Sequence, residues 1–305
     1  MLSFTRLRNS SGRLFKAIVG VTREEFEAVA VAFTAVVEGD AKKQRERPGR
    51  RRQMGAGGKP ALPDAQEQLL FILIYVKQYP TQDLLALLFG QTQPWACKWV
   101  HRLMPLLRDA LGRECHLPLR HVSSVEELRA RCPELQFIVD GTERPVARPS
   151  DEPTQRERYS GKKKRHTVKN DVLTSKKTKK IVWLSPTEPG SKHDKRIMDD
   201  SGPTLPPGSG LDQDTGFQGY APAGVAVRQP KKKPVNGALT EEEKARNREI
   251  SRERIGVEHS IGGMKVSRIA ADKLRNRRVG FDDLVVEAAA GLHNLRRDTV
   301  TRLAA

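Results

Sequence analysis

Apolar residues recur at three- and four-residue spacing over much of the first third of the chain, which predicts a helical region. Four helices follow from this spacing, over residues 22–38, 64–80, 81–89 and 93–107. The first opens with a capping box, in which the side chains of Thr22 and Glu25 satisfy backbone N–H groups at the helix start. Gly90 provides the turn between the last two helices.

The pattern changes at about residue 134, where short apolar runs typical of strands alternate with helical and loop segments. These runs lie at residues 135–139, 167–173, 181–184 and 225–228. A long polar helix is predicted from Thr240, with Glu243 completing a second capping box, to about residue 262. An amphipathic helix follows over residues 281–295. The second region therefore has the pattern of an α/β domain.

The two helices around Gly90 have the pattern of a helix-turn-helix, whose second helix enters the major groove of DNA. That helix would present the polar side chains of Gln93, Lys98 and Arg102 to the DNA. The alternative is an ordinary helical hairpin in which Trp95 and Trp99 are core residues. The two interpretations are compatible.

The net charge favours a polyanionic partner. The 305 residues include 55 Lys and Arg against 37 Asp and Glu, a formal charge of +18. Nucleic acid is the leading interpretation, with ribosomal association and simple solubility as alternatives. A basic, glycine-rich stretch that contains Arg50, Arg51 and Arg52 cannot bury a core and reads as an arm or linker. Such an arm either neutralises backbone phosphates or stays solvated.

Several classes of protein are disfavoured by the sequence. Cys97, Cys115 and Cys132 are odd in number and widely spaced, which suggests neither a disulfide framework nor a zinc ribbon. The longest apolar run, residues 69–76, is too short to span a bilayer. Arginines interrupt the N-terminal segment, which does not read as a secretory signal. We expect a cytoplasmic protein with no membrane partner.

Three acids stand out as candidates for chemistry. Asp140 follows the apolar run at residues 135–139 directly, and Asp214 follows a glycine-rich break. On the long polar helix, Glu258 shares a face with Arg254 and Lys265. Each acid alone reads as a solvated or capping carboxylate, and it is the combination that indicates a site.

Together with neighbouring motifs, these residues resemble the DDE transposases of bacterial insertion sequences, in the group allied to the PIF/Harbinger superfamily. The resemblance rests on Asp140-Gly141-Thr142, on Tyr-Ser-Gly-Lys-Lys-Lys-Arg-His at residues 159–166, on Gly-Ser-Lys-His-Asp at residues 190–194, on Asp-Thr-Gly-Phe at residues 214–217, and on Arg254, Glu258 and Lys265. The family usually has a Tyr three positions before the Arg, where this chain has Ser251.

The resemblance implies the fold class. It is an α/β fold in which a ribonuclease-H-like catalytic domain, a mixed sheet flanked by helices, follows a small all-α helix-turn-helix domain. The expected domains are residues 1–62 for an N-terminal helix and basic arm, residues 63–130 for the helix-turn-helix, and residues 134–300 for the catalytic domain.

The resemblance also implies the chemistry. Asp140, Asp214 and Glu258 would hold two Mg²⁺ or Mn²⁺ ions, which stabilise charge on the attacking and leaving oxygens of a phosphodiester. Water as nucleophile would nick DNA at the element end, and the 3′ hydroxyl would join that end to target DNA. His193 and Asp194 would support the site. The expected DNA contacts are Arg50, Arg51, Arg52, Gln93, Lys98, Arg102, Lys162, Lys163, Lys164, Arg165, Arg254 and Lys265.

Strand order decides between Asp194 and Asp214 as the second acid. In a ribonuclease-H-like sheet the second acid lies on strand four, after the first helix. Residues 192–200 read as the start of that helix, so only Asp214 lies late enough. Asp194 would then cap the helix or support the site from behind.

We expect duplex DNA as partner, both the terminal inverted repeats of the element and the target. We also expect a dimer or higher oligomer in the synaptic complex, and a bacterial, nucleoid-associated location. The alternatives are a domesticated helix-turn-helix protein that binds DNA without cutting it, and a nuclease on the same fold.

Overall fold

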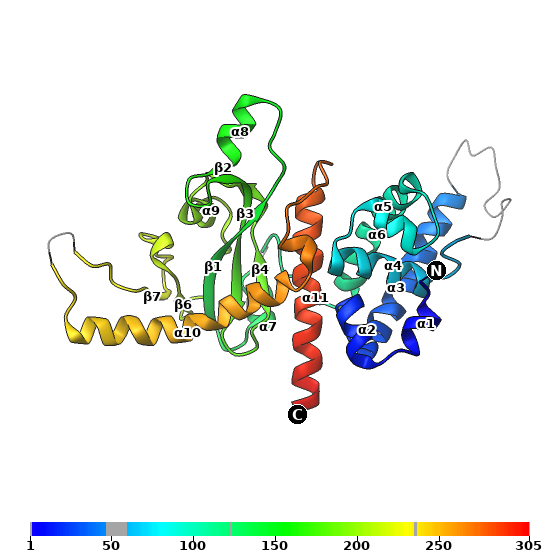
Figure 1. Cartoon of the computed structure of the whole chain (residues 1–305). Helices are drawn as coiled ribbons and strands as arrows, with labels where there is room; N and C mark the ends of the chain where they lie inside the picture. The colour runs from blue at the N-terminus through cyan, green and yellow to red at the C-terminus, as the bar shows by residue number, and fades with distance from the viewer. Residues whose placement is uncertain (1, 47–59, 123, 235–236, 305) are drawn as a thin grey trace. The chain divides into compact units, whose positions relative to one another are not determined.

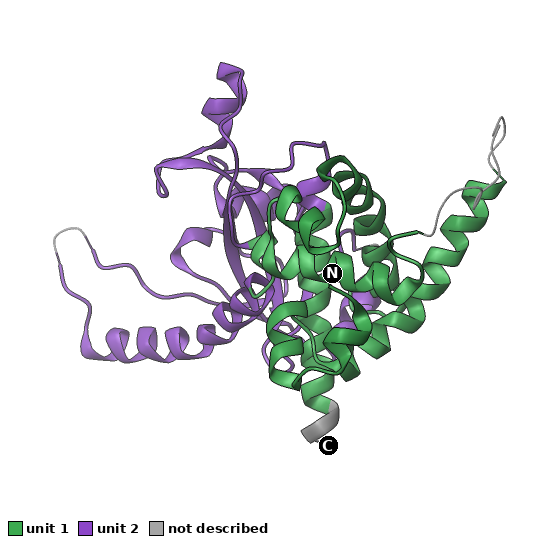
Figure 2. Cartoon of the chain, turned by 45° about the vertical axis from the view of Figure 1, so that its right-hand side comes forward, with its two compact units in different colours: residues 1–117, 266–270, 284–305 green, residues 118–265, 271–283 purple. Residues whose placement is uncertain are grey.

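The structure, a computed structural model, describes residues 2–46, 60–122, 124–234 and 237–304. The chain forms two compact units, coloured separately in Figure 2. Unit 1 contains residues 1–117, 266–270 and 284–305, and unit 2 contains residues 118–265 and 271–283. Each unit therefore combines segments that are distant in the sequence.

Unit 1 is helical. Its elements are α1 (Phe4–Arg8), α2 (Gly12–Val19), α3 (Arg23–Arg45), α4 (Ala65–Gln78), α5 (Gln82–Leu88), α6 (Gln93–Arg113), the 3₁₀ turn η2 (Arg268–Ala270) and most of α11 (Phe281–Ala304). The capping box predicted at Thr22 and Glu25 is confirmed, with both reciprocal hydrogen bonds present. Helices α1 and α2 were not predicted. None of the described helices has both the length and the apolar character needed to cross a bilayer.

The predicted helical hairpin is α5 and α6, joined through a turn in which Gly90 has a φ of +64°. Trp95 packs edge-on against Phe71 of α4 at 5.5 Å between ring centroids, and its ring lies 5.9 Å from that of Trp99. Residues 69–76 of α4 are buried. Both tryptophans are only partly buried, so they pack against the core of unit 1 and do not lie within it.

Unit 2 is built on a mixed sheet (Figure 1). Its strands are β1 (Gln136–Pro145), β2 (Tyr159–Ser160), β3 (Arg165–Ser175), β4 (Ile181–Leu184), β5 (Glu188–Pro189), β6 (Gly210–Asp212) and β7 (Ala226–Arg228). Along the sheet the order is β2-β3-β1-β6-β7, and β4 and β5 also pair with β3. Strand β3 is antiparallel to β1 and β4, whereas β6 and β7 run parallel to β1.

Four helices belong to unit 2: α7 (Val125–Arg131), α8 (Glu152–Arg158), α9 (Asp194–Ser201) and α10 (Glu241–Lys265). A short 3₁₀ turn, η1 (Thr215–Phe217), follows β6. Three antiparallel strands, a helix and two parallel strands are the predicted ribonuclease-H-like arrangement, and the predicted fold class is confirmed. The capping box at Thr240 and Glu243 is also present.

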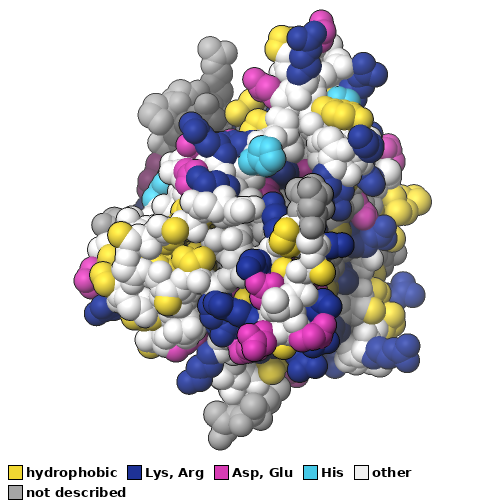
Figure 3. Space-filling model, turned by 90° about the vertical axis from the view of Figure 1, so that its left-hand side faces the viewer, with side chains coloured by type: hydrophobic (Ala, Val, Ile, Leu, Met, Phe, Trp, Pro, Cys, Tyr) yellow, Lys and Arg dark blue, Asp and Glu magenta, His cyan; other side chains and the backbone are white. Residues whose placement is uncertain are grey.

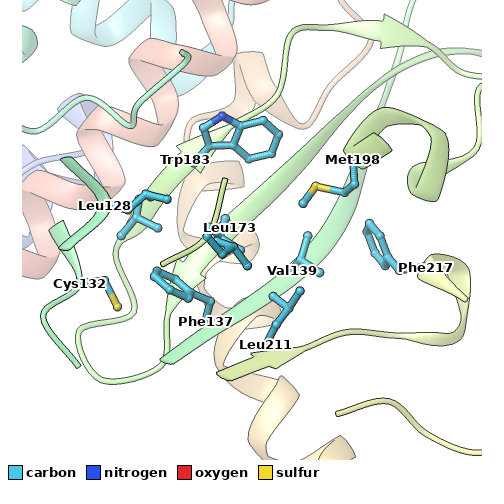
Figure 4. Packing of buried hydrophobic residues seen from close by; sticks show 11 residues of the cluster. Leu128, Cys132, Phe137, Val139, Leu173, Trp183, Met198, Leu211 and Phe217 are labelled. Carbon is cyan, nitrogen blue, oxygen red and sulfur yellow. The ribbon is translucent and has the colours of Figure 1, made fainter. Parts of the chain in front are cut away.

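One face of the sheet carries the hydrophobic core of unit 2 (Figure 4). Phe137 and Val139 of β1 and Leu173 of β3 point to this face, where Met198 of α9 and Phe217 of η1 cover them. Side chains alternate along a strand, so Ile138 and Asp140 point to the opposite face. Helix α10 contacts β1 and β3, and the ion pairs of its Arg254 place it on the Asp140 side.

Candidate active site

Asp140 is the first polar side chain after the buried run of β1. Its Oδ1 accepts a hydrogen bond from the backbone N–H of Gly141 at 2.9 Å. Burial raises the pKa of Asp140 to about 6, while the Arg254 guanidinium lowers it and the charge of Asp214 raises it further. A carboxylate that is mostly buried and crowded by another acid is a frequent feature of functional sites.

Asp214 reaches the same end of the sheet from the neighbouring strand. In the parallel pairing of β1 with β6, Ile138 lies opposite Asp212. Asp140, which is inside β1, and Asp214, which is two residues beyond the end of β6, therefore lie side by side. Asp214 caps η1, and its Oδ1 accepts a hydrogen bond from the backbone N–H of Gly216 at 2.7 Å. Asp214 comes after α9, as expected, but it lies two residues beyond β6 and not on this strand, and its role as the second acid stays a prediction.

Arg254 of α10 lies between the two acids. Its Nη2 is 3.8 Å from Oδ1 of Asp140 and 4.0 Å from Oδ2 of Asp214. The Arg254 side chain is 15% exposed, so this cation acts in a partly desolvated environment. The geometry shows that β1, the end of β6 and α10 converge on one point.

An ionic network fixes α10 at that point. Glu253, the neighbour of Arg254, pairs with Lys176 at 3.1 Å and with Arg228 of β7 at 2.8 Å. The same two cations hold Asp212 of β6, which is fully buried, at 2.7 and 3.1 Å. The network therefore ties α10 to the strands β6 and β7 one residue away from Arg254.

Glu258 lies one turn further along α10 and is exposed. Arg254 and Lys265 both interact electrostatically with Asp140, so the turns of α10 that carry Glu258 pass alongside this acid. Within the described ranges, however, no three acids, histidines or cysteines lie close enough to hold one metal ion. The structure brings two of the three predicted acids together, and the role of Glu258 stays a prediction.

Asp194 lies on the face of the sheet opposite to the Asp140 side chain. A Cβ placed on Gly141 would lie 3.0 Å from Cγ of Asp194, and one on Gly216 would lie 3.4 Å from its Oδ2. The Asp194 carboxylate therefore lies directly behind the segments that carry Asp140 and Asp214. The expectation that Asp194 caps α9 is wrong: the cap residue is His193, which makes no side-chain cap bond, and Oδ1 of Asp194 instead accepts a hydrogen bond from Nζ of Lys169 at 3.1 Å.

Sequence reasoning missed Lys169 and Asp171 on β3. Register places Asp171 opposite Gly141 and Lys169 opposite Glu143, so both point toward Asp194. Asp171 is fully buried, and neither of its side-chain oxygens has a hydrogen-bond partner. Burial raises its pKa well above the usual value, and the charges of Asp194, Asp140 and Asp214 raise it further. The available signal was the alternation of side chains along a strand, which places Lys169, Asp171 and the apolar Leu173 on one face of β3.

The predicted DNA contacts are distributed over several elements. Lys162, Lys163 and Lys164 are exposed at the turn between β2 and β3, and Arg165 is exposed at the start of β3. Lys265 is partly buried near Asp140. On α6, Lys98 is exposed, Gln93 donates a hydrogen bond to Gln82, and Arg102 pairs with Asp40 at 2.9 Å. Arg50, Arg51 and Arg52 lie outside the described residues. On the face shown in Figure 3, Lys and Arg side chains are spread among acidic ones.

The sheet order and the paired acids at its edge define a nuclease of the ribonuclease-H-like class. Residues 139–294, half of the chain, match the family described as DDE superfamily endonuclease, and residues 60–113 match the helix-turn-helix of DDE superfamily endonuclease. The chain therefore belongs to the DDE superfamily endonucleases. Membership implies dependence on a divalent metal ion, and carboxylate oxygens such as those of Asp140 and Asp214 are the donors that Mg²⁺ prefers.

A curated relative is similar over nearly the whole chain. The "Probable transposase for insertion sequence element IS702" of Microchaete diplosiphon is 29% identical over 293 residues, which cover 96% of this chain and 98% of that protein. No solved structure matches the chain.

Proposed function

We propose that this protein is a transposase. It cuts DNA at the ends of an insertion sequence and transfers the resulting 3′ hydroxyl into target DNA. Family membership supports the nuclease activity, and the name of the relative from Microchaete diplosiphon supports transposition. The observation that carries the proposal is the convergence of Asp140 and Asp214 on Arg254, within 4.0 Å, at the edge of the sheet.

The acids Asp140, Asp214 and Glu258 hold two divalent ions, Mg²⁺ or Mn²⁺. Two bound ions supply stabilisation of the charge on the attacking and leaving oxygens of the phosphodiester. Asp140 has a pKa raised to about 6, so it is mostly ionised near neutral pH, and Arg254 favours the ionised form. Arg254 and Lys265 also neutralise the backbone of the bound DNA beside the acids.

The remaining predicted residues also bind duplex DNA. Residues 63–130 carry the helix-turn-helix, with Lys98 as an exposed contact, and residues 134–300 carry the chemistry. Arg102 forms an ion pair with Asp40 and a cation–π contact with Trp99 at 5.1 Å. Its guanidinium is therefore already engaged, and it contributes little to DNA binding. The active form is a dimer or higher oligomer that holds two element ends.

The test is strand transfer with purified full-length protein. The substrates are a duplex carrying the inverted repeats that flank the coding gene and a supercoiled target plasmid, with Mg²⁺ present. We expect sequenced products in which the 3′ end of the repeat is joined to the target. Specific binding of the repeats with neither cutting nor joining would contradict the proposal.

A further inference from the structure

A cluster of positive charge lies in unit 1. Four cationic residues, Arg13, Lys16, Lys77 and Arg296, line a pocket of about 460 Å³ together with Gly20 and Val266. This basic pocket lies where α2 ends and where the last turn of α4, η2 and α11 meet it. Its volume falls within the range of about 300–1,000 Å³ that is usual for small-molecule sites.

Two of the four cations of the basic pocket donate hydrogen bonds to backbone oxygens. Nζ of Lys77 donates a hydrogen bond to the backbone oxygen of Val266 at 3.0 Å, and Nη1 of Arg296 donates one to that of Gly20 at 3.2 Å. Gly20 has a φ of +89°, and a Cβ there would lie 3.0 Å from Cδ of Lys77. Because Gly20 has no side chain, the aliphatic part of Lys77 can pack closely against its backbone. These two hydrogen bonds position Lys77 and Arg296 through uncharged backbone groups.

The pocket carries an excess of positive charge. No carboxylate is among the described residues that line it. Burial lowers the pKa of Lys77, and the charges of Arg296 and Arg268 lower it further. Burial lowers the pKa of Arg296 to about 10, and the charge of the buried Glu25 raises it. The C-terminal end of α2 contributes about half a negative charge at most. The described lining of the pocket therefore presents four cationic side chains and no acidic one.

We propose that the basic pocket binds a phosphate group, and that the source is the backbone of duplex DNA. A phosphodiester supplies the anion that the pocket lacks and accepts hydrogen bonds from several donors at once. Lys77 belongs to the segment at residues 60–113 that matches the helix-turn-helix, so a phosphate held here anchors the DNA beside that motif. The inference rests on the proposed function only in the choice of DNA as the source of the phosphate.

The test removes two charges from the pocket without disturbing buried groups. Arg13 and Lys16 are exposed on α2, so R13A/K16A in the full chain keeps the fold. The control, R6A/R113A, removes two exposed charges of unit 1 outside the pocket. Fluorescence anisotropy with a labelled duplex of arbitrary sequence, over a series of salt concentrations, gives the slope of log affinity against log salt.

We expect the slope of R13A/K16A to be shallower than that of wild type by about 1, and the control to keep the wild-type slope. We also expect inorganic phosphate to raise the Tm of wild type more than chloride of equal ionic strength, and to lose this effect in R13A/K16A. Equal slopes for the two double variants would overturn the proposal. Stabilisation by inorganic phosphate with an unchanged DNA slope would overturn DNA as the source. This assay uses a duplex of arbitrary sequence and measures no cutting. Its result therefore does not depend on whether the protein performs strand transfer.

Discussion

Nη2 of Arg254 lies 3.8 Å from Oδ1 of Asp140, and this ion pair joins α10 to the first strand of the sheet. It opposes the effects that raise the pKa of Asp140, which are burial first and then the charges of Asp214 and Asp194. Arg254 therefore keeps an acid ionised in a place where burial favours its neutral form.

Replacement of Arg254 by Ala should move the pH dependence of cleavage. Without the guanidinium, the pKa of Asp140 rises above about 6, and the acidic limb of the pH–rate profile moves to higher pH by about one unit. R254K should keep most of the wild-type profile. R252A, which removes an exposed cation from the same helix, is the matched control. An unmoved acidic limb in R254A would show that this ion pair does not set the ionisation of Asp140.

Asp214 and Asp194 should respond differently to the same substitution. D214N removes a charge next to Asp140 and is expected to reduce cleavage to background. D194N loses the ion pair with Lys169 but keeps the shape that packs behind Gly141, so it should retain measurable cleavage at a stability cost of about 1 kcal/mol. Single-turnover cleavage of element-end DNA measures both. If D194N is inactive and D214N cuts, the second acid is Asp194.

The buried Asp171 should lower the unfolding free energy by an amount that depends on pH. Its folded pKa is raised above the unfolded value of about 3.9, so the cost is absent below that value and grows as the pH rises through the folded pKa. The unfolding free energy of D171N relative to wild type should therefore increase from pH 4 to pH 8, by about 1–3 kcal/mol. Urea unfolding in the presence of chelator is the measurement. A difference that is constant with pH would mean that Asp171 is not an isolated buried acid.

Lys176 should be needed to keep α10 in place. K176M leaves the buried Asp212 with Arg228 alone and frees Glu253 from one partner. We expect a loss of about 2 kcal/mol in unfolding free energy, together with slower cleavage. K177M changes an exposed lysine at the next position and is the control. Equal stability of the two variants would show that the network does not hold α10.

Short sequence patterns predicted those helices and strands that depend on residues close together in the sequence. The apolar run before Asp140 marks a buried strand, and the reciprocal side chains of Thr22 and Glu25 mark a helix start, because both depend on neighbours a few residues apart. The short helices α1 and α2 were missed because each is too brief for a clear period and depends on packing against α4.

The supporting residues of the site could not be predicted because pairing between distant segments creates them. Asp171 reaches the site only through its register opposite Gly141, and Asp194 is held by Lys169, 25 residues away in the sequence. The link from Glu253 to Asp212 passes through cations of β7 and the end of β3. Acidic or basic type alone does not reveal such partners.

The two compact units divide the chain within α11, which differs from the predicted domain limits. Residues 284–305 belong to unit 1, although residues 134–300 were predicted as one catalytic domain from the resemblance. The apolar face of α11 gives no indication of which unit it packs against. The functional limits at residues 62, 130 and 134 stay predictions.

The most direct test of the account is metal-dependent cleavage of a duplex that carries the inverted repeats flanking the gene. Wild type, D140N, D214N and E258Q are compared in Mg²⁺, in Mn²⁺ and in chelator, with DNA binding measured in parallel. The account predicts that wild type cuts only with a divalent ion and that all three variants bind DNA but cut at background. Cutting by wild type in chelator, or undiminished cutting by E258Q, would contradict it.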